Sequence, residues 1–308
     1  MPAIRIRPTE SKMSDQAQED LQFVMSSFGK VVRVQAIGGG CISDAMRVDV
    51  VDSAAKEKTF FVKANGLHFL DNFQCEAAGL RALDATKTIR VPSVIDVSAS
   101  RGKAWLVLEF IAQGNRDKQY FRRFGDQLAR MHQASVGDAC GWEADNYLGA
   151  AKQPNQSVDS WDAFFAQNRI GYQLRWAIDQ GIADSELKSD CQRIITAMPE
   201  LLRGREQQTV LLHGDLWSGN YLCDESGQSV LIDPAVYRGC REAEFGMLKL
   251  FGGCPQEFYD AYQEAWPLPS GWQRRVNVYV LYHLLNHLNL FGTGYASQCG
   301  SMAKQILK

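Results

Sequence analysis

The sequence has no stretch of about 18 uninterrupted apolar residues, the length that a membrane-spanning helix needs. Its first residues, MPAIRIRPTESKMSDQ, lack the apolar core that a secretory signal peptide carries. No repeat with a period of about 20 to 50 residues is visible, and no segment is low in complexity. We therefore expect a cytoplasmic protein without a leader, a membrane association or a repeat architecture.

An excess of charge of either sign is also missing. The chain has 33 Lys and Arg residues against 35 Asp and Glu residues, which gives a formal net charge of −2. Such a balance creates no global field that would attract nucleic acid or an anionic membrane. We expect neither as a partner, and any anion that the protein binds must be held by a local site.

Paired cysteine motifs are absent as well. The eight cysteines lie at positions 41, 75, 140, 191, 223, 240, 254 and 299, and none belongs to a C-x-x-C pair. A zinc ribbon or a dithiol redox centre would need such pairs. We therefore expect reduced thiols.

The first part of the chain predicts a small lobe built on an antiparallel sheet. Leu21, Val24, Met25 and Phe28 recur at helical spacing, so a first helix is expected over Asp15–Phe28. Five short β-rich runs follow, with one helix after the third. These runs span residues 31–37, 45–51, 58–64, 93–99 and 103–111, and the helix spans residues 72–83.

Helical periodicity dominates after residues 112–115, as the spacing of Phe121, Phe124, Leu128 and Met131 illustrates. The exception is TVLLHGDLWSGNYLCDESGQSVLIDPA, where two apolar runs flank the turn DESGQ and predict a β-hairpin. The chain of 308 residues is about twice as long as an ordinary domain, which suits two lobes. We thus predict an α+β protein with an untethered tail (residues 1–13), a small lobe (14–111) and a larger, mainly helical lobe (112–308).

The stretch HGDLWSGN, residues 213–220, places polar groups directly before this hairpin. Strand pairing would return Asp233 of VLIDP toward Asp215 and Asn220. Magnesium takes one or two carboxylates together with phosphate oxygens, so Asn220 and Asp233 are candidate metal ligands. Asp215 would then accept a proton from an attacking hydroxyl. The alternative is that these residues only cap or begin turns.

Features upstream favour the chemical interpretation, because their order is that of a protein kinase small lobe. Gly38, Gly39 and Gly40 form a loop between two predicted strands, and its backbone N–H groups can approach phosphates closely. Lys63 in the third strand can grip the α and β phosphates of ATP when Glu76 of the following helix orients it.

The motif spacing also matches a protein kinase. His213-Gly214-Asp215 with Asn220 corresponds to H-R-D-x-x-x-x-N, and Asp233-Pro234-Ala235 corresponds to D-F-G. The run VLEFI at residues 107–111, which contains Glu109 and Ile111, is the expected hinge whose backbone reads adenine.

With these motifs the sequence resembles the fructosamine kinase (ketosamine kinase) family. That family is a branch of the aminoglycoside phosphotransferase and choline kinase group, which has a protein-kinase-like two-lobed fold. The match covers about residues 30–296 and rests on HGDLWSGN, DPAVYRGCREAEFGMLKLFGG and LYHLLNHLNLFGTGY, with GGGCIS, FFVKAN and NYLG in support. The Trp-Ser-Gly of the catalytic loop separates this family from the aminoglycoside and choline kinases.

The resemblance implies ATP- and Mg²⁺-dependent transfer of the γ-phosphate to the 3-hydroxyl of a ketosamine, whose unstable 3-phosphate separates into sugar and amine. It makes Asp215 the base, Asn220 and Asp233 the metal ligands, Lys63 the phosphate grip and Glu76 its orienter. The acceptor is then a ketosamine small molecule or a glycated protein side chain. The sequence leaves open which sugar and which amine are preferred.

The acceptor site is expected near Trp217, because an aromatic face packs on a sugar and attracts a cationic amine. A Trp that fills the lobe core is the alternative. His283, Asn286 and His287 share one face of the last long helix, with Asn289 nearby, and would suit hydroxyl recognition. The His-x-x-x-His spacing also permits zinc, but no third ligand or base Glu accompanies it. Hydrogen bonding from the helix to a loop is the simpler explanation of this stripe.

Two residues raise separate questions. Glu244 of REAEFGM stands where the family resemblance leads us to expect Asp, which puts local geometry but not the fold in doubt. Cys41 follows the three glycines, whose backbone N–H groups could stabilise a reactive thiolate. A disulfide between Cys41 residues of two chains would make a redox-sensitive homodimer, so we expect either a monomer or such a homodimer. The alternative is a small buried side chain.

Two other functions remain open at this stage. One is a kinase for another hydroxylated amine, of the aminoglycoside or choline type. The other is a nucleotide-binding regulatory pseudokinase, which would need a missing catalytic part, whereas Lys63, Glu76, Asp215, Asn220 and Asp233 are all present.

Overall fold

The computed structural model describes residues 14–38 and 42–308, and it has an α+β architecture, as predicted. Gly39, Gly40 and Cys41 lie outside the described residues, as does the predicted tail. Among the helices that are described, none is long and apolar enough to cross a membrane.

The described residues fall into two compact units. The first runs up to Ala82 and also includes Val91–Gln113. The second comprises Leu83–Arg90 and Gly114–Lys308. The segment Leu83–Arg90 therefore groups with the helical unit, although the sequence analysis assigned it to the small lobe.

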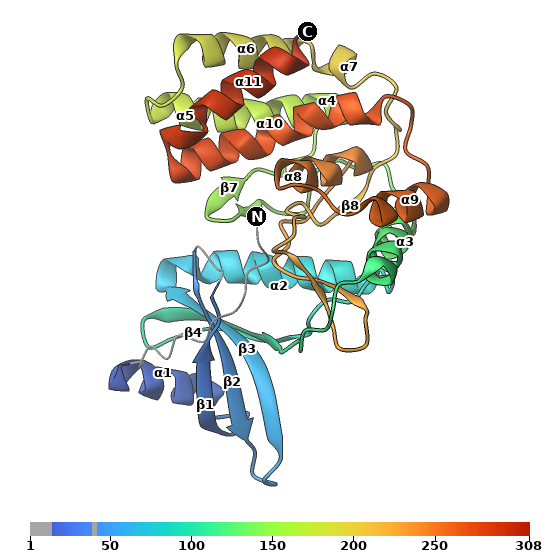
Figure 1. Cartoon of the computed structure of the whole chain (residues 1–308). Helices are drawn as coiled ribbons and strands as arrows, with labels where there is room; N and C mark the ends of the chain where they lie inside the picture. The colour runs from blue at the N-terminus through green and yellow to red at the C-terminus, as the bar shows by residue number, and fades with distance from the viewer. Residues whose placement is uncertain (1–13, 39–41) are drawn as a thin grey trace. The chain divides into compact units, whose positions relative to one another are not determined.

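The first unit contains a five-stranded antiparallel sheet in the order β1-β2-β3-β5-β4 (Figure 1). Each predicted β-rich run is confirmed, with bounds that differ by at most two residues. The strands are β1 (Lys30–Ala36), β2 (Asp44–Val51), β3 (Glu57–Gly66), β4 (Val94–Ser100) and β5 (Lys103–Glu109).

Helices α1 (Asp15–Met25) and α2 (Leu70–Ala85) cover opposite faces of this sheet. Val62 of β3 belongs to the apolar core that contains the buried side chains of α1. Side chains alternate along a strand, so the adjacent Lys63 points to the other face. There it reaches Glu76 of α2. The strand period therefore places the lysine of the predicted phosphate grip beside its acidic partner.

Helix α1 ends three residues before the predicted end at Phe28. Residues 26–28 form turns, in which the N–H of Phe28 donates to the Met25 carbonyl at 2.9 Å. Gly29 then adopts a φ of +145°, and a Cβ atom on it would lie 2.4 Å from the Val51 carbonyl oxygen. The close approach of two backbones, rather than helix propensity, decides where the chain turns into β1.

The second unit is mainly helical, as predicted. Its longer helices are α3 (Lys118–Ala134), α5 (Tyr172–Asp179), α6 (Ser185–Thr196), α9 (Gln256–Ala265), α10 (Trp272–Phe291) and α11 (Ala296–Ile306). Shorter helical segments are α4 (Trp161–Phe164), the π-helix η2 (Phe165–Gly171), α7 (Met198–Leu201), η3 (Arg241–Ala243), α8 (Glu244–Leu250) and η4 (Thr293–Tyr295), while η1 (Leu67–Phe69) belongs to the first unit.

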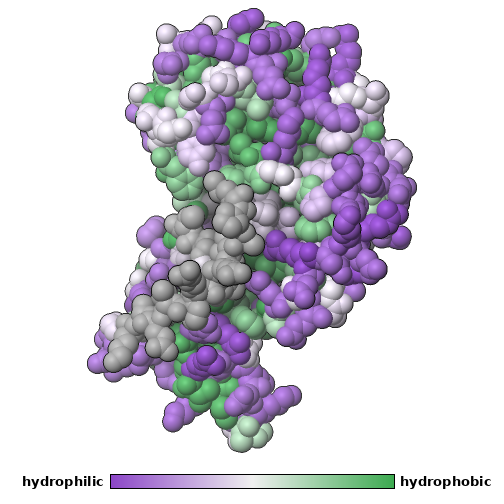
Figure 2. All heavy atoms as spheres, viewed as in Figure 1, coloured by the Kyte–Doolittle hydropathy of each residue, from purple (hydrophilic) through white to green (hydrophobic). Residues whose placement is uncertain are grey.

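Helix α10 is the central element of the second unit. It packs against α5, α8 and α11, and 15 of its 20 residues are buried. Figure 1 shows α10 crossing the unit between α11 and α8. On the face drawn in Figure 2, hydrophilic side chains cover most of the outer helices and hydrophobic ones show between them. The polar residues of α10 are therefore held inside the unit, where each needs a partner.

Three short antiparallel strand pairs complete the second unit. They are β6 (Asn146–Leu148) with β7 (Ala151–Gln153), β9 (Tyr221–Cys223) with β10 (Ser229–Leu231), and β8 (Val210–Leu212) with β11 (Tyr237–Gly239). The pair β9–β10 is the hairpin predicted around DESGQ. The HGDLWSGN loop connects β8 to β9, as expected.

Candidate active site

In the first unit, Lys63 and Glu76 form a bidentate ion pair. Lys63 Nζ lies 2.8 Å from Glu76 Oε1 and 2.9 Å from Glu76 Oε2, and both side chains are largely buried. The pairs Ala45 with Lys63 and Lys63 with Leu106 fix the lysine in the centre of the sheet. A buried pair of this kind is costly to break, because either partner alone would be an uncompensated charge.

The structure also places the other predicted nucleotide-binding residues that it describes. Gly38 follows β1, and a Cβ atom built on it meets no described atom within 4 Å, so packing alone does not require glycine there. At the predicted hinge, Glu109 ends β5 and Ile111 is buried. The Glu109 N–H donates to the Ser93 carbonyl at 2.9 Å, so it is already occupied.

In the second unit, His213 locks the catalytic loop to the segment that carries Asp233. Its Nε2–H donates to the Ile232 carbonyl at 2.9 Å, and its own carbonyl accepts the N–H of Ala235 at 2.9 Å. Burial lowers the pKa of His213, so the ring is neutral. Bonds on both sides of Asp233 therefore bring that residue toward the loop, as the hairpin predicted.

Gly214 is required for this close approach. Its φ is +82°, and a Cβ atom there would lie 2.1 Å from the Ala235 carbonyl oxygen. Any other residue would push the two segments apart. The glycine of HGD is thus explained by backbone contact rather than by chemistry.

Asp215 has one oxygen in a hydrogen bond and one without a partner. Asn220 Nδ2 donates to Asp215 Oδ2 at 3.0 Å and to the Asp215 carbonyl at 2.9 Å. The other oxygen, Oδ1, is buried and has no hydrogen-bond partner among the described residues. Burial and then the negative charge of Asp233 raise the pKa of Asp215 well above its ordinary value. A carboxylate with a raised pKa and a bare oxygen is suited to take a proton.

Asp233 has a backbone conformation that is unusual for a residue with a side chain. Its φ is +56°, in the left-handed region, where Asp is tolerated better than most residues. The buried amides of Asn146 and Gln153 hold the following segment, donating to the Val236 carbonyl at 2.7 Å and the Ala235 carbonyl at 3.1 Å. Tyr282 of α10 in turn donates to Gln153 Oε1 at 2.7 Å. Strain of this kind is typical of a functional position that its surroundings hold in place.

The donor set of the second unit fits a magnesium ion. Asn220 uses its Nδ2 for Asp215, which leaves its carbonyl oxygen for a cation. Asp233 supplies a carboxylate. Magnesium usually takes one or two such oxygen ligands from the protein and further oxygens from the phosphates of its substrate. The described residues contain no group of three or more His, Cys, Asp or Glu side chains that could hold a metal ion.

Glu244, which stands where Asp was expected, still contacts the catalytic loop. It is buried at the start of α8, and its Oε1 accepts the N–H of Gly214 at 3.1 Å while its Oε2 accepts that of His213 at 2.6 Å. His132 Nε2 lies 3.5 Å from the same Oε2. Burial favours the neutral form of Glu244, but its partners outweigh this and lower its pKa. The longer glutamate therefore still reaches the loop, and the local geometry is intact.

Trp217 lies on the surface of the catalytic loop, partly exposed, and not in the lobe core. Its ring centroid is 5.1 Å from that of Phe251. A Cβ atom on Gly219 would lie 2.5 Å from the indole, so the glycine lets the ring lie over the loop. The expectation that Trp217 borders the acceptor site stays a prediction with this geometry in its favour.

The polar stripe of α10 divides into two parts. Asn286 and Asn289 are bonded to Gln173 of α5, with Gln173 Nε2 3.0 Å from Asn286 Oδ1 and Asn289 Nδ2 2.7 Å from Gln173 Oε1. These two asparagines therefore join helices. His287 Nδ1–H donates to the His283 carbonyl at 2.8 Å, and His283 Nδ1 is buried without a partner among the described residues.

Sequence reasoning missed the residues that support the site. Asn146 and Gln153 hold the Asp233 segment, although NYLG was recognised as a family motif. Arg116 donates to the Ser218 carbonyl at 3.2 Å and to the Tyr221 carbonyl at 2.6 Å, which fixes the far end of the catalytic loop. No local pattern marks Arg116, because its partners lie about a hundred positions away.

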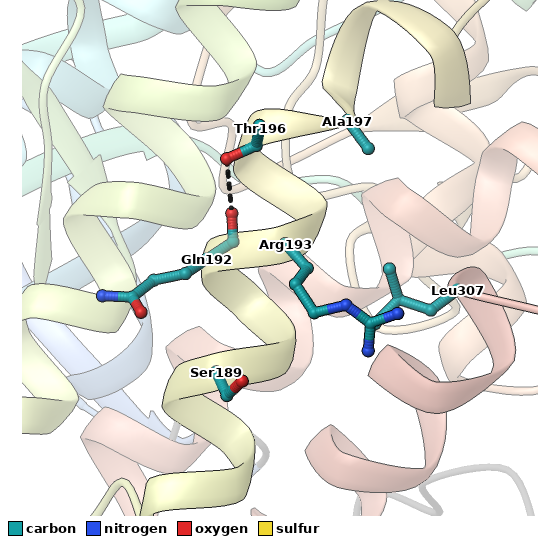
Figure 3. A pocket seen from close by; sticks show the side chains of 6 residues that line it. All are labelled: Ser189, Gln192, Arg193, Thr196, Ala197 and Leu307. Atoms are coloured by element: carbon teal, nitrogen blue, oxygen red, sulfur yellow. Dashed lines mark hydrogen bonds between the residues drawn. The ribbon is translucent and has the colours of Figure 1, made fainter.

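A surface hollow of about 470 Å³ lies away from these residues, beside α6 and the end of the chain (Figure 3). It is lined by Ser189, Gln192, Arg193, Thr196, Ala197 and Leu307. Thr196 Oγ1 donates to the Gln192 carbonyl at 3.0 Å within it. None of the predicted site residues lines this hollow, so it is not the catalytic centre.

Comparisons with known proteins agree with the motifs. A family model described as fructosamine kinase matches residues 13–308. A protein of Synechocystis sp. named "Probable ketoamine kinase" is 41% identical over 292 residues, which cover 93% of this chain and 95% of that protein. The chloroplastic protein-ribulosamine 3-kinase of Oryza sativa subsp. japonica is 41% identical over 284 residues, which cover 91% of this chain and 80% of that protein.

Solved structures show the same fold. The crystal structure of a candidate fructosamine-3-kinase from Haemophilus somnus has a TM-score of 0.82 and 28% identity, covering 94% of this chain and 97% of that one. An aminoglycoside phosphotransferase solved with ADP and hygromycin B has a TM-score of 0.66 at 13% identity, covering 92% and 96%. At that identity the second likeness concerns the fold alone.

Proposed function

The chain belongs to the fructosamine kinase family, and from this premise we propose that it transfers the γ-phosphate of ATP to the 3-hydroxyl of a ketosamine. The observation that carries the proposal is the Asp215 carboxylate, with Oδ2 held by Asn220 and Oδ1 buried without a described partner. This carboxylate oxygen is suited to accept the proton of the sugar hydroxyl while the hydroxyl oxygen attacks the γ-phosphorus of ATP. ADP then leaves, and the sugar carries the phosphate.

Asn220 and Asp233 are the residues that would hold magnesium. When bound, this ion neutralises charge on the transferring phosphate. It would also offset the Asp233 charge, which contributes to the raised pKa of Asp215. His213 and Glu244 do not touch the reacting groups and act by positioning the loop.

Lys63 is proposed to contact the α and β phosphates of ATP, with Glu76 orienting it through the bidentate ion pair. At the hinge, the Glu109 N–H donates to the Ser93 carbonyl. Recognition of adenine by the backbone of Glu109 and Ile111 stays a prediction. The loop at Gly38 is proposed to approach the phosphates through its backbone. The roles of Gly39, Gly40 and Cys41, including the redox hypothesis, stay predictions.

The proposed phosphate acceptor, a ketosamine, is based on the family and on Trp217, which lies on the catalytic loop. Ketosamines carry a hydroxylated sugar and a secondary amine, and Trp217 offers a face that suits both groups. The 3-phosphate of such a sugar is unstable, so the proposed consequence is release of the amine, a deglycation. Fructosyl and ribulosyl amines, free or on protein side chains, are the substrates to be compared.

The test is a panel assay of ADP release with ATP and Mg²⁺. Fructosyl-lysine, ribulosyl-lysine, choline and an aminoglycoside are compared at equal concentration, with Asp215→Asn as the background. We expect the ketosamines to turn over fastest, and phosphorus NMR to show a sugar phosphate that decays with release of lysine. Faster turnover of choline or the aminoglycoside would move the protein to the alternative kinase class. Nucleotide binding with no turnover of any acceptor would support the regulatory pseudokinase.

A further inference from the structure

Five aromatic side chains form a continuous cluster that begins at the catalytic loop. We call Trp217, Phe251, His287, Phe291 and Tyr295 the aromatic platform. Ring centroids are 5.1 Å apart for Trp217 and Phe251 and 5.4 Å apart for Phe251 and His287. His287 in turn lies 5.4 Å from Phe291 and 5.2 Å from Tyr295. Each ring is within the distance at which aromatic groups contact.

The outer part of the platform is open to solvent. Phe251 is 38% exposed and Phe291 is 52% exposed, and Trp217 and Tyr295 are partly exposed. Exposed aromatic rings that contact one another form a contiguous apolar surface, which commonly marks a binding site. The end of α10 and the segment after it, with Gly292 at a φ of +87°, place Phe291 and Tyr295 on either side of the same turn.

The platform is electrically neutral but electron-rich. Burial lowers the pKa of His287, so its ring is uncharged at neutral pH. Its Nδ1–H donates to the His283 carbonyl, which can only accept, so Nε2 carries a lone pair. Aromatic faces and an accepting nitrogen favour C–H groups and a cationic amine, and they disfavour a carboxylate.

The platform is continuous with the catalytic centre through Trp217, which lies two residues after Asp215 on the same loop. In a ketosamine the amine is attached to C1, and C1 is joined to C2, the neighbour of the carbon that carries the 3-hydroxyl. A substituent on the amine therefore leaves the sugar near the hydroxyl that faces Asp215. If the sugar lies against Trp217, the substituent continues toward Phe251, Phe291 and Tyr295. A flexible alkyl chain can follow such a surface, whereas a short substituent cannot reach it.

We propose that Phe251, Phe291 and Tyr295 bind the alkyl chain on the amine of the ketosamine, a deepening that rests on the proposed function. The platform thereby selects substrates with a long apolar chain, such as the methylene stem of a lysine side chain, over compact amino acids whose carboxylate lies beside the sugar. This specificity is a property of the outer rings and not of the catalytic residues.

The test compares two ketosamines, fructosyl-hexylamine and fructosyl-glycine, in wild type, Phe291→Ala and Tyr295→Ala. For each variant we expect kcat/KM with fructosyl-hexylamine to fall by about tenfold, mostly through KM, because the variant loses one aromatic contact. With fructosyl-glycine the change should stay below about twofold. Phe23→Ala, which removes an exposed phenylalanine of α1, is the matched control and should change neither value.

Equal losses on both substrates, or no loss on either, would overturn the platform proposal while ketosamine phosphorylation itself stands. Turnover of neither ketosamine by wild type would instead overturn the proposed function. Light scattering on the same proteins adds an independent check. If Phe291→Ala converts a dimer to a monomer and lowers both activities equally, the rings serve contact with a second copy and the proposal is wrong.

Discussion

Glu244 Oε2 accepts the backbone N–H of His213 at 2.6 Å, and this bond ties the start of α8 to the catalytic loop. Oε1 of the same carboxylate accepts the next N–H, that of Gly214, at 3.1 Å. Two consecutive backbone donors that would otherwise be buried and unsatisfied thus share one side chain. The loop that carries Asp215 therefore depends on a residue that has no chemical role of its own.

The first prediction concerns this dependence. Glu244→Ala leaves both N–H groups without their acceptor, and each unsatisfied buried donor costs about 1–3 kcal/mol. We expect the free energy of unfolding, measured in urea, to fall by about 2–6 kcal/mol, with a parallel loss of kcat. Glu244→Gln keeps one acceptor oxygen and should lie between Ala and wild type. The exposed Glu225→Ala is the control, and an equal effect of both Ala variants would contradict the assigned role.

The second prediction concerns Asp215. Asp215→Asn removes the proton acceptor but keeps the shape of the side chain, so the protein should fold and bind ATP while kcat falls by ~10² to 10⁴-fold. Nucleotide affinity from calorimetry and thermal unfolding separate this outcome from misfolding. Near-normal turnover would show that another group takes the proton.

Much of this site was predictable because its signals are local in the sequence. Lys63, Asp215 and Asn220 lie in short motifs, and strand alternation or hairpin pairing determines where each side chain points. The five strands were found within two residues for the same reason. The end of α1 was placed too late, because the approach of Gly29 to Val51 is a tertiary contact that helix periodicity does not show.

The supporting residues were not predictable, because their partners are distant in the chain. Gln153 reaches the Ala235 carbonyl across 82 positions, and Arg116 reaches the Tyr221 carbonyl across 105. Buried amides and arginines of this kind have no period or spacing. The left-handed conformation of Asp233 was likewise hidden, since Asp before Pro gives no sign of a positive φ.

The third prediction separates metal binding by the Asp233 carboxylate from the cost of the positive φ at this residue. Asp233→Ala and Asp233→Gly both remove the carboxylate, so both should abolish Mg²⁺-dependent ATP binding in calorimetry. Their stabilities should differ, however, because only glycine adopts a positive φ without a steric penalty. We expect the Gly variant to be more stable than the Ala variant by about 1 kcal/mol. Unchanged ATP and Mg²⁺ affinity in both variants would remove Asp233 from the metal site.

The last prediction concerns acid sensitivity and starts from the buried histidines of the second unit. Burial, followed by the charges of His287 and Arg169, lowers the pKa of His283 to about 3. In the unfolded chain a histidine titrates near pH ~6.5. Between these two values the unfolded state binds a proton that the folded state excludes. The contribution of His283 to the free energy of unfolding is therefore fully present above about pH 6.5. It is lost as the pH falls toward 3, by up to about 1.4 kcal/mol per pH unit.

The measurement is urea unfolding of wild type and His283→Leu at pH 7, 6 and 5. Leucine fills the buried space of the His283 side chain and cannot be protonated. The free energy of unfolding of the variant should therefore fall less steeply than that of wild type as the pH decreases. The exposed His68→Leu is the matched control and should follow wild type. If His283→Leu and wild type lose stability in parallel, then another group dominates the acid response and His283 is protonated as easily in the folded state as in the unfolded one.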